Sequence, residues 1–280
     1  MKRQNRSYSL ITIILLTVLS WSHLTHAQVI KNIVPFKGAI GGGVTTYHGD
    51  ICPGVSCINP NYDVNVSLRY FIDKYFSFRP EAHFFKINAS DSDGPNSARN
   101  LSFESTNLSM TFNLVYDFIP YNPRPDFRKA ISPYIFLGVG GLFFNPKASY
   151  NGVSHELQPL ATEGIEYSRF TAIVPGGMGI RFKISNSVDF MLEYTYTQSL
   201  SDYLDDVSGT YIDNGQLIGV SADLADRSTE GGYTPTRTDD GIHWEDGASR
   251  GNPSTKDSYS MLTAKISFDL FKLDVICPEF

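Results

Sequence analysis

The sequence lacks a long apolar run, a surplus of basic residues and a nucleophile with its base in a recognisable spacing, and each absence excludes a class of protein. Beyond the first 27 residues, no segment offers the roughly 20 apolar residues that a membrane-spanning helix requires. The formal net charge of −6 argues against nucleic acid as a partner. The sequence has no H-E-x-x-H motif and no outward Ser-His pair, so it predicts neither an enzyme nor a catalytic residue.

The N-terminal segment, in contrast, has the pattern of a secretory signal peptide. Three basic residues within the first six positions precede an apolar run at residues 10–19, about half the length of a spanning helix. Small residues follow at Thr25 and Ala27, which predicts cleavage before Gln28, and the absence of cysteine there argues against a lipid anchor. Residues 28–280 would carry a net charge of −9, because residues 1–27 contain three basic residues and no acidic ones.

Composition and periodicity both indicate strands. Aromatic residues make up 13% of the chain and charged residues only 19%, which favours strands over helices. Apolar and polar residues alternate with a period of two in residues 63–71, 76–84, 107–118, 189–196 and 262–269. With the glycine-rich residues 36–47, the apolar residues 133–144 and residues 167–184, the sequence predicts an all-β protein of eight strands.

The connections between these strands alternate in length. Tight turns, "DKY" and "SNS", follow the second and sixth strands, whereas longer segments follow the first, third, fifth and seventh: residues 51–61, 90–100, 151–166 and about 205–256. Short turns on one rim and long loops on the other are typical of transmembrane barrels. We therefore expect an eight-stranded antiparallel up-and-down transmembrane β-barrel with one very long outer loop and periplasmic termini. The Pro-rich connection at residues 119–132 is longer than this pattern requires.

A soluble β-sandwich or lipocalin-like barrel would also alternate, so the two faces of the strands have to be compared. The exposed face of a soluble barrel carries many Lys and Glu, but here one face is an unbroken series of Val, Leu, Phe and Tyr that would aggregate in water. Tyr and Phe also gather at strand ends, as in the interfacial girdles of membrane barrels, and Tyr203 is the expected last girdle residue of the seventh strand. We therefore expect a barrel surrounded by outer-membrane lipids.

The opposite face carries charges of both signs, which have to pair in the narrow lumen of an eight-stranded barrel. We predict a lumen charge network made of Arg69, Arg79, Glu81, Arg181, Glu193 and Lys265. His83 alternates with this set, and we interpret it as hydrogen-bonded among lumen charges, not as a metal ligand. Glu81 and Glu193 are interpreted as ion-paired, not as an acid/base pair for catalysis.

The stretch "YLDDVSGTY" opens the longest loop, which is rich in Asp and Glu. Asp202, Asp205 and Asp206 are candidate ligands for a divalent cation beside the anionic glycolipid leaflet, although their spacing does not match a calcium loop. The default expectation for this loop is a solvated acidic face, and the metal site is the weaker alternative. No cofactor and no small-molecule substrate is predicted.

Three cysteines lie outside the signal segment. Cys52 and Cys57 are separated by four residues, so in an oxidising envelope they could form a disulfide that closes a small loop, or they could remain free thiols. Cys277 is then unpaired. It is either an inert thiol or a link to another chain.

Several ordered blocks carry a family resemblance. They are "GGGVTTYHGDI", "YIFLGVGGLFFNPKA", "LQPLATEG", "YSRFTAIVPGGMGIRFKI", "YLDDVSGTY" and the closing "CPEF". Together they resemble the PorG-type outer-membrane barrels of the type IX secretion system of Bacteroidota. The resemblance implies a non-enzymatic accessory component that associates with a periplasmic ring lipoprotein, with residues 119–132 and the tail at residues 272–280 as the contact surface. The alternatives are a stand-alone envelope-stability or surface ligand-binding barrel, and a diffusion pore, which the narrow lumen disfavours.

Overall fold

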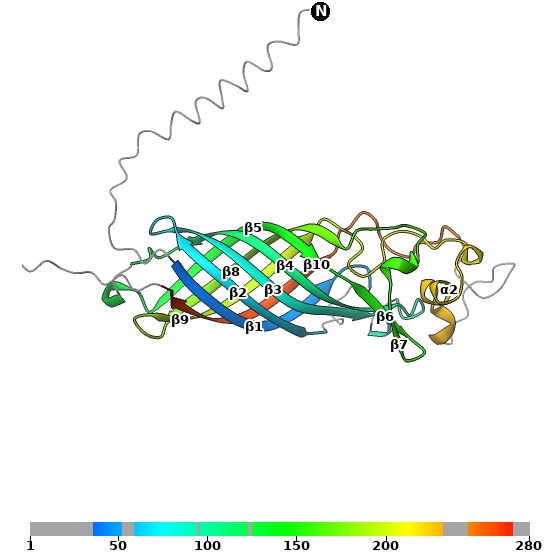
Figure 1. Ribbon diagram of the computed structural model, residues 1–280, viewed down its shortest axis with the longest axis horizontal. Helices are drawn as coiled ribbons and strands as arrows, with labels where there is room; N and C mark the ends of the chain where they lie inside the picture. The colour runs from blue at the N-terminus through cyan, green and yellow to red at the C-terminus, as the bar shows by residue number, and fades with distance from the viewer. Residues whose placement is uncertain (1–35, 52–58, 94–95, 123–124, 232–245, 271–280) are drawn as a thin grey trace, which may run out of the picture. The chain divides into compact units, whose positions relative to one another are not determined.

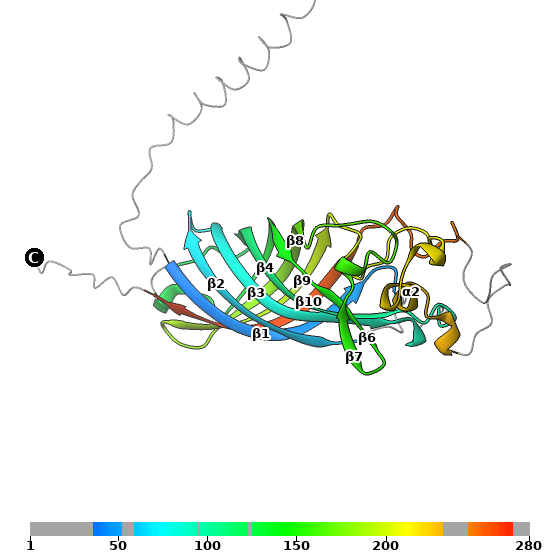
Figure 2. The same ribbon diagram turned by 45° about the vertical axis from the view of Figure 1, so that its right-hand side comes forward.

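Eight antiparallel strands close into a barrel in the computed structural model of the protein (Figures 1 and 2). They are β1 (Phe36–His48), β2 (Asn61–Phe71), β3 (Phe76–Ser90), β4 (Ser102–Asp117), β5 (Ile131–Phe143), β8 (Phe170–Lys183), β9 (Val188–Ser199) and β10 (Ser258–Asp269). Each barrel strand pairs with the next one along the chain, and β1 also pairs with β10, which closes the ring. The predicted eight-stranded antiparallel barrel is confirmed.

The structure describes residues 36–51, 59–93, 96–122, 125–231 and 246–270. The chain divides into two units, Met1–Ile33 and Val34–Phe280, and every described residue belongs to the second unit. The predicted signal peptide, the three cysteines and the tail at residues 272–280 lie outside the described residues.

The connections differ between the two ends of the barrel (Figure 1). Two tight turns, residues 72–75 and 184–187, lie with the longer connection at residues 118–130 at the end where β1 begins and β10 ends, which we call the short-turn end. The other end, the long-loop end, holds residues 49–60, 91–101, 144–169 and 200–257, and the last two of these connections are much the longest.

The long-loop end is more ordered than the sequence analysis expected. Residues 151–166 are not a plain loop, because β7 (Val153–Glu156) pairs with β6 (Pro146–Tyr150) in a hairpin that follows β5, and β6 also pairs with the beginning of β4. The other elements here are η3 (Asp91–Asp93), η5 (Gln158–Leu160), η6 (Asn214–Gln216), α2 (Val220–Ala225) and η7 (Ser228–Gly231), while η4 (Pro125–Phe127) lies at the short-turn end. Within the described ranges, no helix is long and apolar enough to cross a membrane.

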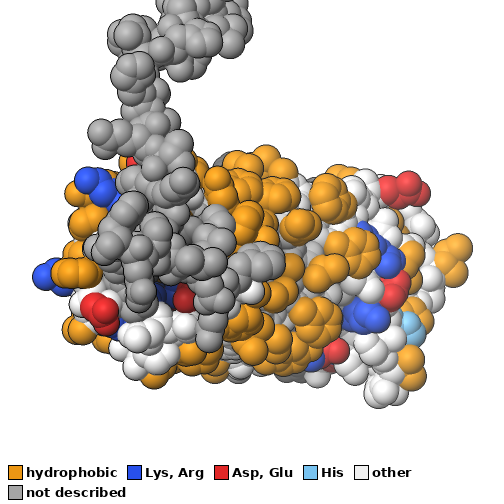
Figure 3. All heavy atoms as spheres, turned by 60° about the vertical axis from the view of Figure 1, so that its left-hand side comes forward, with side chains coloured by type: hydrophobic (Ala, Val, Ile, Leu, Met, Phe, Trp, Pro, Cys, Tyr) orange, Lys and Arg blue, Asp and Glu red, His pale blue; other side chains and the backbone are white. Residues whose placement is uncertain are grey.

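The alternation of each strand puts apolar side chains on the outer wall and polar ones inside. Outward side chains such as Val64 and Val66 are more than half exposed, whereas Asn65 and Ser67 between them are buried. Figure 3 shows hydrophobic side chains covering much of the barrel wall. Closure pairs every barrel strand on both sides, as a hydrocarbon environment requires.

Two glycines on inward positions allow the strands and lumen side chains to approach closely. A Cβ atom on Gly177 would lie 2.3 Å from the carbonyl oxygen of Tyr194, and one on Gly179 would lie 2.5 Å from the ring of Tyr134. Larger residues at these positions would displace the neighbouring strand or the Tyr134 ring, so the glycines leave room for the lumen residues described below.

Candidate functional sites in the lumen and at the two ends

Four charged side chains cross the middle of the lumen and pair with one another. Arg79 of β3 binds Glu193 of β9 at 2.5 Å and Glu81 at 3.3 Å. Lys265 of β10 binds Glu193 at 2.6 Å and also binds Glu81. All four residues are at most 4% exposed, so two cations and two carboxylates balance away from water.

Further side chains extend this network from the neighbouring strands. His83 lies with its Nδ1 atom 2.9 Å from Asp63 and its Nε2 atom 3.4 Å from Glu81. The Tyr134 hydroxyl donates to Glu193 at 2.5 Å. The sequence analysis placed His83 among lumen charges but did not include Asp63 or Tyr134 in the network.

A second charge cluster lies toward the short-turn end. Arg69 and Arg181, the other two residues of the predicted network, both bind Asp117, at 2.6 Å and 2.5 Å. Lys37 binds Asp189 at 2.6 Å and Asp269 at 3.0 Å. The six predicted residues are therefore divided between two clusters, and the sequence analysis missed Asp117 and Lys37, although both occupy inward positions in the alternation.

These ion pairs fill the lumen. The interior of an eight-stranded barrel is just wide enough for side chains, and here Arg79, Glu193 and Lys265 meet from different walls. A permeating ion would have to separate buried charges, and breaking one such pair costs about 3–5 kcal/mol. The arrangement can stabilise a closed barrel, but it does not provide an aqueous channel.

The long-loop end carries a hydrophobic core of its own, which we call the outer cap. It includes Leu204, Val207 and Leu224 of the longest loop, packed with Phe103 and Phe144 from the barrel rim. Leu204 is 0% exposed and Val207 1% exposed. The expectation of a solvated acidic face is therefore wrong for this part of the loop, because its apolar residues bury the neighbouring aspartates with them.

Two of those aspartates make separate sets of contacts. Asp205 accepts a hydrogen bond from the Val207 amide at 2.9 Å, and its Oδ2 atom lies 2.7 Å from the Tyr47 hydroxyl. Asp206 accepts hydrogen bonds from the hydroxyls of Thr162 at 2.5 Å and Tyr167 at 2.7 Å. These contacts join the longest loop to β1 and to the β7–β8 connection.

Asp202, the third candidate metal ligand, accepts a hydrogen bond from Ser208 at 2.7 Å. The three candidates therefore have different protein partners. Among the described residues, no group of three His, Cys, Asp or Glu side chains is placed to hold a metal ion.

Burial of the aspartates in the outer cap changes their acidity. Burial raises the pKa of Asp205 to about 7 and that of Asp206 to about 6, although Arg250 beside Asp206 opposes the second change. Asp257, just before β10, has its pKa raised well above the usual value, first by burial and then by the charge of Asp205. All three carboxyls therefore hold their protons to a higher pH than an ordinary aspartate.

Tyr203 does not lie in a girdle at the end of a strand. Strand β9 ends at Ser199, four residues earlier, and the Tyr203 ring stacks on Tyr167 with ring centres 4.7 Å apart and an interplanar angle of 9°. The aromatic residue that was predicted to face lipid headgroups thus contributes to packing within the outer cap.

Ser249 lies in the sequence Gly247-Ala-Ser-Arg-Gly251, which matches the G-x-S-x-G pattern of hydrolase nucleophiles. Its hydroxyl donates to the carbonyl of Gly251 at 2.7 Å, and its backbone forms an isolated bridge with Thr210. Residues 250–257 form no helix, so the strand–turn–helix context of a nucleophile elbow is missing.

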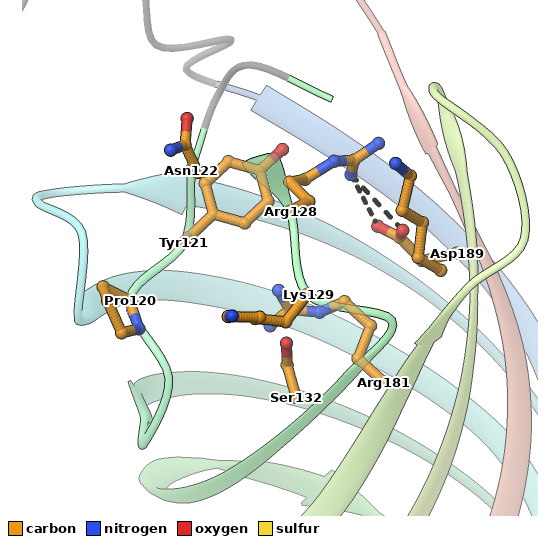
Figure 4. Close-up of a pocket in the computed structure, with 9 residues that line it drawn as sticks. Pro120, Tyr121, Asn122, Arg128, Lys129, Ser132, Arg181 and Asp189 are labelled. Carbon is orange, nitrogen blue, oxygen red and sulfur yellow. Dashed lines mark hydrogen bonds and ion pairs between the residues drawn. The ribbon is translucent and has the colours of Figure 1, made fainter. Parts of the chain in front are cut away.

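At the short-turn end, the connection at residues 118–130 folds across the mouth of the barrel (Figure 4). The Tyr121 ring stacks on Phe71 with ring centres 4.0 Å apart, and its amide donates to the carbonyl of Lys74 at 2.7 Å. Arg128 donates to the carbonyl oxygens of Ser185 and Asn186. The connection is therefore fixed to both other turns at this end.

Comparison with known proteins identifies the class of the barrel. The profile of the outer membrane protein beta-barrel domain family matches residues 11–225, so the chain belongs to that family. Membership places the protein in the outer membrane. No curated protein matches the sequence. Because outer-membrane barrels have short periplasmic turns and long extracellular loops, we expect the long-loop end to be the outer end.

Solved structures with a similar fold come from several bacteria. Neisserial surface protein A has 10% identity and a TM-score of 0.42, with 84% of this chain and 97% of that chain covered. The attachment invasion locus protein Ail of Yersinia pestis, in complex with the heparin analogue sucrose octasulfate, has 15% identity and a TM-score of 0.37, with 83% and 97% covered. The outer membrane protein OprG of Pseudomonas aeruginosa has 12% identity and a TM-score of 0.37, with 85% and 99% covered.

Proposed function

We propose that the protein is a non-enzymatic accessory component of the type IX secretion system that acts through surface contacts and not as a conduit. The buried ion pairs of Arg79, Glu81, Glu193 and Lys265 carry this proposal, because they fill the lumen through which a solute would have to pass. With the lumen closed, the two ends of the barrel remain as the surfaces on which a partner can act.

The periplasmic end is the contact surface that we propose for a secretion partner. The resemblance to PorG-type barrels implies a periplasmic ring lipoprotein as that partner. The connection at residues 118–130 supports this choice, since it is longer than strand connection requires and is held in place by Tyr121 and Arg128. The tail at residues 272–280 is proposed as a second part of the same surface.

Deletion of the gene in its native host tests the proposal. We expect secreted cargo to be lost from the medium and to be restored by a plasmid copy of the wild-type gene. Undiminished secretion in the deletion strain would refute the secretion role. In a pull-down, loss of residues 272–280 should weaken the recovery of the ring lipoprotein, and unchanged recovery would remove the tail from the proposed surface.

A second candidate is a stand-alone barrel that binds ligands at the cell surface or supports envelope stability. The folded outer cap favours it, because Arg250 and Glu163 pair at 2.9 Å in a buried position and hold a fixed surface outside the membrane. Under this alternative, the deletion strain would secrete normally but would become sensitive to detergents or lose adhesion to a surface ligand.

A further inference from the structure

The outward face of β8 remains apolar over a greater length than the outward faces of β1 and β3. Counted from the short-turn end, every outward residue is apolar over residues 36–44 of β1 and residues 76–84 of β3, and the next outward residues are Thr46 and Lys86. On β8, residues 170–182 contain no polar outward side chain. The apolar faces thus span nine residues on β1 and β3 but thirteen on β8. Since a strand crosses a bilayer with about 9–11 residues, β8 exceeds this length.

The excess lies at the long-loop end, because all three apolar faces begin at the short-turn end. For strands tilted by about 40°, four additional residues correspond to roughly 10 Å along the barrel axis. Phe170 therefore lies beyond the level at which β1 and β3 become polar. Lipid chains end near that level, so the Phe170 ring is surrounded by headgroups and water.

Two neighbouring segments extend the same surface. Phe143, at the end of the apolar outward face of β5, is the direct partner of Phe170 in the sheet register. Leu200 follows β9, and its amide donates to the carbonyl oxygen of Ala172 at 3.0 Å. We call these four residues the apolar strip. Phe143, Phe170 and Leu200 are 47%, 64% and 60% exposed, and a contiguous patch of this kind marks an interaction site.

We propose that a second copy of this barrel, inserted in the same membrane, covers the apolar strip. Copies in the outer membrane share one orientation, so their strips lie at the same height and meet when two β5–β8 walls face each other about a twofold axis. A different protein would need an apolar patch at the same height above the lipid chains. The inference goes beyond the proposed function and does not depend on it.

The area of the strip alone is too small for a stable interface. Phe143 and Phe170 expose roughly 200 Å² in each copy. A stable interface needs about 800 Å² on each partner. The lipid-facing side chains below the strip, such as Leu137, Val139 and Met178, are each more than 60% exposed and supply further area on the same walls. Since lipid chains are as apolar as these side chains, burying them adds packing, and the hydrophobic driving force comes from the strip.

Photo-crosslinking of the mature protein in lipid vesicles tests the inference. The photoreactive residue p-benzoylphenylalanine replaces Phe170 in one variant and Tyr62 in the control. Tyr62 is an outward aromatic residue, 47% exposed, on β2, four strands away from β8 around the ring. Because a twofold interface puts the same wall of both copies in contact, we expect at least about five times more crosslinked dimer from position 170 than from position 62.

Energy transfer between donor-labelled and acceptor-labelled copies in dilute vesicles measures the association itself. Phe170→Ser should lower the dimer fraction about tenfold, because it removes the largest exposed ring of the strip. Tyr62→Ser is the matched control and should change it less than about twofold. The crosslinking variants keep an aromatic ring at each position, so they still decide the question if a serine variant folds poorly.

Three results would overturn the inference. Equal crosslinking from both positions, or equal loss of energy transfer in both serine variants, would mean random encounters in the membrane. Crosslinks from position 170 to lipid alone, with energy transfer at the level of chance, would mean that lipid covers the strip. In the native host, a crosslinked product whose mass is not twice that of the mature chain would assign the strip to a different protein.

Discussion

The hydroxyl of Tyr47 lies between two buried carboxylates of the outer cap, 2.7 Å from Asp205 and 2.6 Å from Asp257. A phenol has one proton to donate, so it cannot form hydrogen bonds to two ionised carboxylates at once. One carboxyl of the pair must hold a proton for both contacts to persist, and the two groups titrate as a unit. We predict that the outer cap loosens as pH rises and this proton is lost.

The size of the effect follows from the acidity of the pair. The pKa of Asp205 rises from 3.8 to about 7, mainly through burial. The folded state binds the proton more tightly than the unfolded state, so the bound proton stabilises the outer cap. This stabilisation is complete below about pH 4 and is lost as pH rises through 7. The gap between the two pKa values corresponds to about 4 kcal/mol, or roughly a thousandfold change in the opening equilibrium.

Other charged groups around the pair have to be separated from it. The charge of Asp50 further raises the pKa of Asp205 and that of Arg99 lowers it. Asp206, whose pKa is raised to about 6, loses its proton at a lower pH than the pair. The variant Asp257→Asn separates the effect of the pair from that of the other groups, because it removes the shared proton. The asparagine keeps an acceptor for the Leu204 amide, which in the wild type donates to Asp257 at 2.9 Å.

Hydrogen exchange of residues 200–211 in the mature protein, in nanodiscs between pH 6 and 8.5, measures the effect after correction for intrinsic rates. Protection in the wild type should fall by about tenfold over this range, because most of the thousandfold change lies between about pH 4 and pH 6. In Asp257→Asn the fall should be much smaller, and β9 should keep its protection in both proteins. The reasoning is refuted if the wild type shows no change or if both proteins lose protection with the same slope.

Three further predictions concern the ion pairs. Glu193→Ala leaves Arg79 and Lys265 without a shared carboxylate and should cost about 3–5 kcal/mol, seen as a lower urea midpoint in micelles; an unchanged midpoint would contradict the assigned pairing. Arg250→Ala leaves Glu163 buried and unpaired, and should raise exchange in residues 200–211 at least tenfold without lowering the urea midpoint of the barrel; a lowered midpoint would mean that cap and barrel unfold together. Planar bilayers should show no stable conductance steps with the wild type, and regular steps would show that the lumen opens.

The barrel and its inward residues could be predicted because side chains alternate along each strand with a period of two and because each strand pairs with two neighbours. Once Val66 faces lipid, Ser67 and Arg69 must face inward, and closure extends this assignment around the ring. Lys37 and Asp117 follow from the same rule, and counting inward positions from the strand ends would have found them.

The outer cap could not be predicted in this way. Its contacts join residues far apart in sequence, such as Tyr47 with Asp257, 210 positions later, and no local periodicity encodes such a pair. Tyr203 illustrates the error that results. Tyr203 follows Tyr194 and Tyr196 in the sequence and was assigned to the same strand, but the chain leaves the barrel at Ser199 and the Tyr203 ring stacks on Tyr167, which belongs to another connection.

The two candidate functions use opposite ends of the molecule, and this separates them experimentally. Lys129→Glu changes only the periplasmic mouth, while Arg250→Ala changes only the outer cap, and the filled lumen lies between the two sites. If the protein serves secretion through a periplasmic partner, the first variant should reduce secreted cargo in a complemented deletion strain and the second should not. If it acts as a surface barrel, Arg250→Ala should reduce adhesion or envelope integrity and Lys129→Glu should not. A strain in which both variants behave like the wild type, with normal protein levels, would exclude both assignments.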